Sequence, residues 1–235
     1  MHIPRFINQI SSSLLDFLYP PVCLACQDLL PDGNQKVCSK CWTRIPPIRK
    51  ELPLYQETRT KLLVEGNIHD LISCYVFEKE GPFQHIAHAL KYKEYTSLGV
   101  ELGKRLGQFA LDWNLKVDII IPVPLHPIKQ RERGYNQSDF IARGASLILG
   151  IPFAPYIVRR IRYTQTQTKL NLEERRKNME AAFESLPGAE KIVTGKHCLL
   201  IDDVITTGAT TNSCAQSLLA TGAATITAAS VALAQ

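Results

Sequence analysis

The stretch from Cys198 to Thr210, CLLIDDVITTGAT, restricts the fold of this chain more than any other stretch. Its four leading apolar residues predict a buried β-strand, and Asp202 and Asp203 follow at the end of that strand. A loop rich in Thr and Gly then enters a helix, which Thr210 is suited to cap. Hydroxyls and backbone N–H groups at a helix N-terminus bind anions, whereas paired carboxylates suit sugar hydroxyls or a hydrated Mg²⁺. We therefore predict a pocket for a ribose 5-phosphate.

From about residue 70 onward, the chain alternates strand-like and helix-like segments. Strands are expected at 71–77, 117–121, 198–201 and 225–232, and helices at 83–92, 98–113, 138–149 and 210–220. This alternation predicts an α/β fold, a parallel sheet flanked by helices. Because ligands bind at the carboxyl ends of parallel strands, Pro122–His126 and Asp202–Gly208 are expected on one rim.

Four of the seven cysteines form two Cys-x-x-Cys pairs, Cys23 with Cys26 and Cys38 with Cys41. In a reducing compartment such pairs indicate a metal rather than disulfides. Two such pairs can close a tetrahedral four-thiolate site, so we predict one structural zinc ion. A redox-active cysteine cluster and a [4Fe–4S] cluster are the alternatives. The remaining cysteines lie in apolar or helical surroundings, as expected of small core residues.

Two segments flank this predicted finger. Apolar residues from Ile3 to Leu18 recur with helical spacing, and Pro20 and Pro21 end the pattern. That helix can pack on the protein or lie on a membrane surface. After Cys41, a proline-spaced stretch reaching residue 53 predicts a linker. We therefore divide the chain into residues 1–53, helix and finger, and residues 54–235, the main domain.

The chain has no apolar run of the roughly 18 residues that a spanning helix needs, and its start does not resemble a secretory signal. We therefore expect a cytoplasmic protein. A peripheral position at the inner membrane is the alternative if the N-terminal helix lies on a membrane surface.

Positive charge is concentrated in residues 126–180, which hold eleven Lys and Arg against five Asp and Glu. This excess favours an anionic partner, either phosphate and pyrophosphate or nucleic acid, over an ordinary solvated surface. Cations that follow phosphates, with tyrosines that stack on bases, are typical of single-stranded nucleic acid binding. The alternative places the tyrosines in the core and the cations at pyrophosphate. The residues concerned are Tyr135, Tyr156, Tyr163, Arg131, Arg133, Arg159, Arg160 and Arg162.

Residues 198–210 resemble the phosphoribosyl-pyrophosphate (PRPP) signature of type I phosphoribosyltransferases, and the chain is similar nearly end to end to the ComF (competence protein F, GntX-like) family. The similarity is carried by the four-Cys finger and by Ala89–Tyr92, Ile121–His126, Arg133–Gln137, Arg162–Leu170, Arg175–Asn178 and Ala182–Phe183. The resemblance implies a type I phosphoribosyltransferase-like domain with an N-terminal zinc finger. It also implies an association with DNA uptake and natural transformation.

The resemblance further implies roles for individual residues. Asp202 and Asp203 hold the ribose 2- and 3-hydroxyls as the catalytic pair. The 5-phosphate is held by Thr206, Thr207, Gly208, Ala209 and Thr210, and Val204 and Ile205 belong to the same PRPP-binding segment. Pro124, Leu125 and His126 line a pyrophosphate loop. Residues 159–170 form a flexible hood, which contains Arg160, Arg162 and Gln167. Arg133 supplies a further cation for the pyrophosphate. Because Pro122–His126 contains no Lys or Arg, Mg²⁺ and these arginines must neutralise the pyrophosphate.

Two functions fit these features. In the first, the protein is a transferase in which a nitrogen nucleophile displaces pyrophosphate from C1 of PRPP, and the acceptor is unidentified. In the second, it is a non-catalytic, PRPP-responsive module that binds single-stranded DNA during competence, with proteins of the DNA-uptake machinery as partners. The residues alone leave open whether the protein is an enzyme.

Overall fold

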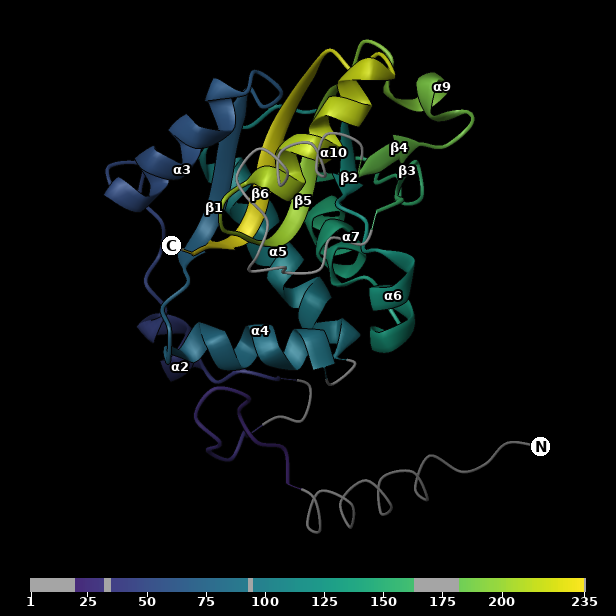
Figure 1. Cartoon of the computed structure of the whole chain (residues 1–235). Coiled ribbons are helices and arrows are strands. Elements are labelled where there is room, and N and C mark those ends of the chain that lie inside the picture. Colours follow the sequence, from purple (N-terminus) through teal and green to yellow (C-terminus); the bar gives the residue numbers. More distant parts are fainter. Residues whose placement is uncertain (1–19, 32–34, 93–94, 163–181, 235) are drawn as a thin grey trace, which may run out of the picture.

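The apolar segments of the main domain form one parallel sheet with strand order β1-β6-β5-β2 (Figure 1). The computed structural model describes residues 20–31, 35–92, 95–162 and 182–234. The strands are β1 (Asp70–Val76), β2 (Ile119–Pro122), β5 (His197–Ile205) and β6 (Thr225–Leu233). The predicted parallel sheet is thus confirmed.

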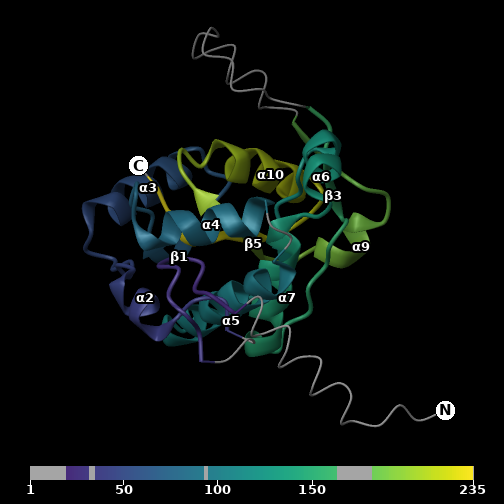
Figure 2. The ribbon, with the colours of Figure 1, turned by 90° about the horizontal axis from the view of Figure 1, so that it is seen from below.

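Helices cover both faces of this sheet (Figure 2). One face carries α3 (Pro53–Val64) and α10 (Ala209–Ala220), and the other carries α5 (Thr96–Asp112) and α7 (Gln137–Leu149). Successive strand residues point to opposite faces. Accordingly, Ile119 and Ile121 join the core beneath α3 and α10, whereas Ile120 joins the core beneath α5 and α7.

Close packing of α5 on α7 fixes the position of α7. A Cβ atom on Gly103 would lie 2.0 Å from the backbone oxygen of Ile141, and one on Gly144 would lie 2.2 Å from that of Val100. Only glycine allows the two backbones to approach this closely. The N-terminus of α7 is therefore held rigidly at the carboxyl ends of the strands.

The other elements surround the sheet. Helix α4 (Pro82–Tyr92) crosses the carboxyl ends of the strands (Figures 1 and 2). The remaining elements are α2 (Ser39–Arg44), α6 (Pro127–Arg133), α9 (Ala189–Val193) and the antiparallel pair β3 (Val158–Arg160) and β4 (Phe183–Ser185).

The stretch predicted as a linker is bound to the edge of the sheet. Ile48 N–H donates to the carbonyl of Cys74 (2.8 Å), and Val76 N–H donates to that of Pro46 (2.9 Å). Helix α3, which was not predicted, begins directly afterwards with Pro53 in its first turn. Backbone pairing with β1 therefore replaces the freely extended stretch that the prolines suggested, and it protects an exposed strand edge.

The finger packs against the main domain through an aromatic contact. Cys23 and Cys41 are buried in the same core as Ile72. The ring of Trp42 stacks on that of Tyr75, with centroids 6.1 Å apart. The guanidinium of Arg105 lies over the Trp42 ring, with its Cζ 3.7 Å from the ring centroid.

The predicted N-terminal helix lies outside the described residues. Within the described residues, no helix is both long and apolar enough to cross a bilayer.

Candidate functional site

The four finger cysteines come together as one cluster. The sulfur atoms of Cys23, Cys26, Cys38 and Cys41 all lie within 4.8 Å of one another. Backbone N–H groups point at two of them, from Cys38 to Cys23 Sγ (3.3 Å) and from Cys41 to Cys38 Sγ (3.4 Å). Such bonds stabilise thiolates, the form in which cysteine binds metal. The set fits a tetrahedral structural zinc site and offers no open position for catalysis.

The acid pair lies within β5 and not beyond its end. Asp202 is paired with Ser230 of β6, and pairing continues to Ile205. The strand predicted to end at Ile201 is therefore longer than expected. Aspartate is unfavourable in isolated strands. Here the unbroken hydrogen-bond register with β6, together with side-chain partners for both carboxylates, outweighs that preference.

Both carboxylates are bonded to partners from other elements. Lys91 Nζ lies 3.0 Å from Asp203 Oδ2, and Gln137 Nε2 donates to the same oxygen (3.2 Å). Ser138 Oγ donates to Asp202 Oδ1 (3.3 Å). The two carboxylates therefore lie in different environments, because Asp203 is ion-paired with the Lys91 ammonium, whereas Asp202 accepts a hydrogen bond from the neutral hydroxyl of Ser138.

This difference separates the acidities of the pair. Burial, and then the charge of Asp203, raise the pKa of Asp202 to about 7. Burial also works against ionisation of Asp203, but the Lys91 ammonium and the hydrogen bonds to that carboxylate outweigh it and lower its pKa. Asp203 is therefore ionised, and Asp202 is poised to gain or lose a proton near neutral pH.

A small pocket opens beside Asp202, and we call it the donor pocket. Its cavity is about 40 Å³. The lining residues are Asp202, Val204, Ile205, Thr206, Thr207, Gly208, Ala209, Thr210 and Thr211. All the predicted phosphate-binding residues thus share one concave surface with one of the two predicted carboxylates.

Helix α10 begins at the floor of this pocket. Its N-cap is Gly208, with no side-chain cap hydrogen bond, so the predicted capping role of Thr210 is wrong. Gly208 has φ +78°, and a Cβ atom there would lie 2.5 Å from Leu62 Cδ2. The left-handed turn starts the helix one residue earlier than expected. The N-cap glycine offers no side-chain oxygen, and the Ala209 N–H donates to Thr207 Oγ1 at the long distance of 3.5 Å, so an anion can compete for the first N–H groups of the helix.

The supporting residues from α4 and α7 were missed by reasoning from sequence. Lys91, Gln137 and Ser138 were within or beside segments that carry the family resemblance, yet nothing in their spacing linked them to Asp202 and Asp203. Their position within or directly after those segments is the one sequence feature that could have pointed to them, and only the fold brings them to the acid pair.

The predicted pyrophosphate loop lies at the end of β2. Pro124 and Leu125 line a second cavity, together with Asp139 and Tyr156. His126 caps α6, and its ring accepts the Ile128 N–H (3.3 Å). Burial, and then the positive charges of Arg160 and Arg131, lower the pKa of His126. The imidazole is therefore neutral at pH 7 and adds no positive charge here.

The arginines predicted to neutralise pyrophosphate lie in different surroundings. Arg160 of β3 lies within electrostatic reach of Asp202; burial lowers the pKa of this arginine, and the Asp202 charge opposes that effect. The guanidinium of Arg133 instead lies over the ring of Tyr92, with its Cζ 5.6 Å from the ring centroid. Arg162 is exposed. Gln167 lies outside the described residues, as does most of the predicted hood.

The tyrosines of the basic block also differ. Tyr135 donates its hydroxyl to the carbonyl of Leu90 and packs edge-on against Phe140. The ring of Tyr135 is thus used in packing, which agrees with the alternative that places the tyrosines in the core. Tyr156 is 72% exposed, and Tyr163 lies outside the described residues.

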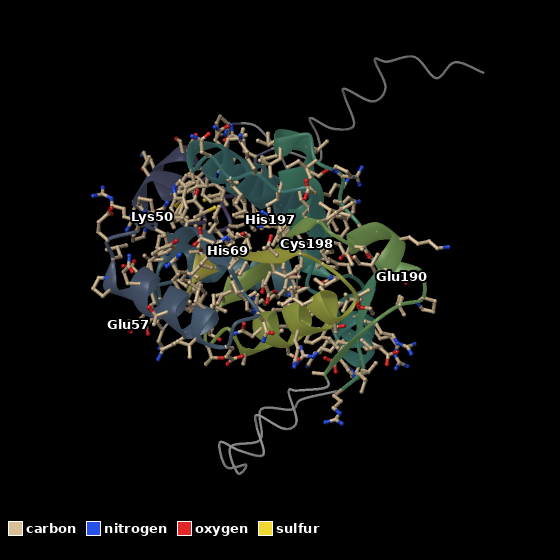
Figure 3. All side chains as sticks on the ribbon, turned by 90° about the horizontal axis from the view of Figure 1, so that it is seen from above. Lys50, Glu57, His69, Glu190, His197 and Cys198 are labelled. Carbon is tan, nitrogen blue, oxygen red and sulfur yellow. The ribbon has the colours of Figure 1, made fainter. Side chains whose placement is uncertain are left out.

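At the opposite, amino end of the sheet, polar groups pair with one another (Figure 3). The rings of His69 and His197 face each other, with centroids 6.3 Å apart. His197 N–H donates to Asp118 Oδ2, and its Nε2 lies 2.8 Å from Thr227 Oγ1. These contacts tie strand ends together, whereas the carboxyl end carries an acid pair beside a cavity.

Two known domain families match separate parts of the chain. The double zinc ribbon domain family matches residues 14–52, and the phosphoribosyl transferase domain family matches residues 140–234. Residues 14–52 contain four cysteines and no histidine, enough for one zinc ion.

Among curated proteins, Competence protein F from Haemophilus influenzae is 38% identical and covers 83% of this chain and 90% of its own. The DNA utilization protein YhgH from Salmonella typhi is 30% identical and covers 84% and 78%, respectively. Competence protein ComFC from Bacillus subtilis is 30% identical and covers 94% and 88%.

Among solved structures, the glutamine PRPP amidotransferase from B. subtilis aligns with a TM-score of 0.41 and 20% identity, covering 60% of this chain and 30% of that chain. So low a score adds nothing to the assignment. The assignment rests on the long alignments to curated relatives, the zinc ribbon and the phosphoribosyltransferase-like sheet: the chain belongs to the ComF family.

Proposed function

We propose that the main domain binds PRPP at the donor pocket and that the protein acts in the handling of DNA during uptake. One observation carries the proposal: residues 204–211 and Asp202 line a single cavity at the uncapped start of α10. A phosphate fits the N–H groups of the loop, and ribose hydroxyls fit the adjacent carboxylates. The relatives are named as competence and DNA utilization proteins, which supports the cellular role.

The two carboxylates suit a donor that arrives with Mg²⁺. Carboxylate oxygens are the ligands that Mg²⁺ prefers, and Asp202, which faces the cavity, is the better placed to offer one. When bound, the ion would neutralise charge on the leaving pyrophosphate. Asp203 would accept a hydrogen bond from a ribose hydroxyl, and the loop would hold the 5-phosphate.

The reaction that this arrangement supports is transfer of the phosphoribosyl group. The bond from C1 to the pyrophosphate oxygen breaks, and a bond from C1 to an acceptor nitrogen forms; pyrophosphate leaves with the bonding electrons, and the acceptor loses a proton. Residues of this chain would act mainly by holding the donor in place and stabilising its charges. The acceptor is unidentified.

Calorimetry with PRPP, with and without Mg²⁺, tests the binding proposal. The double variant Asp202→Asn, Asp203→Asn keeps side-chain size and removes the charge. We expect PRPP affinity to fall by about 100-fold or more, because two hydrogen bonds to charged groups contribute about 1.5–3 kcal/mol each. Asp112→Asn, which alters an exposed carboxylate on α5, is the control. Equal affinity in the wild type and the double variant would place PRPP elsewhere.

A second assay separates an enzyme from a binding module. Protein, PRPP and Mg²⁺ are incubated with a panel of bases and amines, and pyrophosphate release is measured. Release that depends on one acceptor supports the transferase. Tight PRPP binding without release under any condition supports the module.

One observation favours the module that binds single-stranded DNA. Tyr156 is 72% exposed, and the basic block that contains it also carries the exposed Arg159 of β3. An exposed ring near cations can stack on a base while the cations follow phosphates. We expect a labelled single-stranded oligonucleotide to be retained at low salt and released as salt rises, and Tyr156→Ala to weaken retention. No retention at low salt would remove this candidate.

A further inference from the structure

The pyrophosphate end of a PRPP molecule has no obvious cation in the loop that the sequence assigned to it. Pro122–His126 contains no Lys or Arg. The neutral ring of His126 accepts the Ile128 N–H, and the guanidinium of Arg133 lies over the Tyr92 ring. Pyrophosphate is the most highly charged part of such a ligand, so a positive side chain that reaches it would add to the proposed Mg²⁺ ion and to Arg160, which lies within electrostatic reach of Asp202 and His126.

Lys91 is a cation that already lies at the acid pair. It is the penultimate residue of α4, the helix that crosses the carboxyl ends of the strands (Figure 2). Its Nζ is 3.0 Å from Asp203 Oδ2. The Lys91 side chain is 28% exposed, and the Asp203 side chain is 11% exposed. The Lys91 side chain is therefore partly exposed beside the acid pair and not enclosed in the core.

The backbone around Lys91 is anchored beside the predicted pyrophosphate loop. The hydroxyl of Tyr135 donates to the carbonyl of Leu90, directly before Lys91. The ring of Tyr92, directly after it, lies under the Arg133 guanidinium. Arg133 is the last residue of α6, and Tyr135 follows it in the segment that leads to α7. Lys91 is thus held between Asp203 on one side and the segment leading from the loop on the other.

We propose that Lys91 is the positioning cation for the pyrophosphate of the donor and that its contact with Asp203 belongs to the ligand-free protein. This inference rests on the proposed function. Lysine has a long, flexible stem with three donors on one ammonium, so it can change partners without moving α4. Asp203 keeps Gln137 as a donor, and a ribose hydroxyl replaces the ammonium on Oδ2. No covalent bond changes in this exchange.

The competing role is a fixed counter-charge. If Lys91 only neutralises Asp203, its removal leaves a buried carboxylate without its cation and disturbs every ligand that uses the acid pair. If Lys91 serves pyrophosphate, its removal affects only ligands that contain pyrophosphate. The two roles therefore differ in ligand selectivity and not merely in affinity.

The test measures PRPP, ribose 5-phosphate and inorganic pyrophosphate by calorimetry on the full chain. The main variant is Lys91→Gln, whose amide can still donate to Asp203 but carries no charge. Lys91→Arg restores the charge, and Lys104→Met on the exposed surface of α5 is the control. Lys91→Met, checked by urea unfolding, is the second neutral variant.

We expect Lys91→Gln to weaken PRPP and pyrophosphate about tenfold or more, the loss typical of a hydrogen bond to a charged group. Affinity for ribose 5-phosphate should stay within about twofold, and Lys91→Arg should recover most of the PRPP affinity. An equal loss for PRPP and ribose 5-phosphate would overturn the proposal and leave PRPP binding intact as a function. Absence of PRPP binding by the wild-type protein would instead overturn the proposed function, and this inference with it.

Discussion

The zinc finger and the donor pocket are assembled in opposite ways. The finger takes its four cysteines from one short stretch between Cys23 and Cys41, and their sulfur atoms lie within 4.8 Å of one another. The donor pocket takes its lining from residues 202–211, whereas the acid pair at its side is bonded to Lys91, Gln137 and Ser138 from distant elements. A site made by local spacing is visible in a sequence, whereas a site completed by packing is visible only in part.

The two regions should also depend on different sources of stability. Four thiolates brought together repel one another until a metal is bound, so part of the folding free energy of the finger comes from the ion. The donor pocket is held by the sheet, by the close contact of α5 with α7 and by α3 behind Gly208. Changes to each region should therefore act separately, and the following predictions test that separation.

The largest effect is expected from Cys38→Ser, which removes one zinc ligand. Zinc content should fall from about one equivalent to near zero, and residues 20–45 should become sensitive to protease. PRPP affinity should remain within about twofold, because the donor pocket contains no finger residue. Metal analysis, limited proteolysis and calorimetry measure these outcomes, with the exposed neighbour Ser39→Ala as control. If the finger resists protease after complete chelation of the metal, its folding does not depend on zinc, and this prediction is wrong.

A smaller effect is expected from Gly208→Ala at the floor of the pocket. The residue has φ +78°, and the new Cβ would lie 2.5 Å from the buried Leu62. Backbone strain costs about 1–2 kcal/mol and overpacking about 1–3 kcal/mol, so the free energy of unfolding should fall by about 2–5 kcal/mol.

Gly150→Ala is a matched control for that change. Gly150 has φ +67°, and no atom lies within 4 Å of the position of its Cβ. This variant should lose only the strain, about 1–2 kcal/mol. Urea unfolding of both variants gives the difference. Equal losses would mean that α3 does not confine the turn.

Thr207→Val should reduce PRPP affinity without changing stability. Thr207 is exposed in the pocket, and its hydroxyl lies 3.5 Å from the N–H of Ala209. Valine keeps the volume and loses the hydroxyl, which should cost about 1–3 kcal/mol of binding if a phosphate oxygen is left under-bonded. Calorimetry compares this variant with Thr60→Val on the exposed side of α3. Unchanged affinity would show that backbone N–H groups alone hold the phosphate.

The smallest effect is expected from Asp139→Asn in the first turn of α7, the helix that supports the acid pair. Burial raises the pKa of Asp139 to about 6 from its ordinary 3.8, against the hydrogen bond from Asn136. The folded protein thus binds this proton more tightly than the unfolded chain. Stability is lost as pH rises from about 4 to 6, and the full penalty remains at pH 7.

Asparagine removes this penalty and keeps an oxygen for Asn136. The variant should be more stable than the wild type at pH 7, by about 1 kcal/mol after allowance for solvent screening, and the gain should vanish near pH 4. Urea unfolding at both pH values tests this, with Asp112→Asn as control. The same difference at both pH values would rule out titration of Asp139 as its cause.

The sequence by itself determined the positions of the main strands along the chain, the four cysteines of the finger and the loop of the donor pocket. These features depend on neighbours in the chain: apolar runs of strand length, cysteine spacing, and a Gly-containing loop between a strand and a helix. Errors occurred where local preference competes with tertiary contacts. The sequence predicts that the strand ends before Asp202 and Asp203, but both lie within β5. It predicts a linker in the proline-spaced stretch before α3, but that stretch is hydrogen-bonded to β1.

Only the tertiary structure decided which carboxylate is ionised, what supports it and how the helix beside it begins. Lys91 reaches Asp203 because α4 crosses the strand ends, and Gln137 and Ser138 reach the acid pair because glycines let α7 sit directly on α5. The packing of α3 behind Gly208 is equally non-local. These contacts join residues far apart in the chain, and their energies come from burial and charge in the assembled fold, which neither spacing nor periodicity encodes.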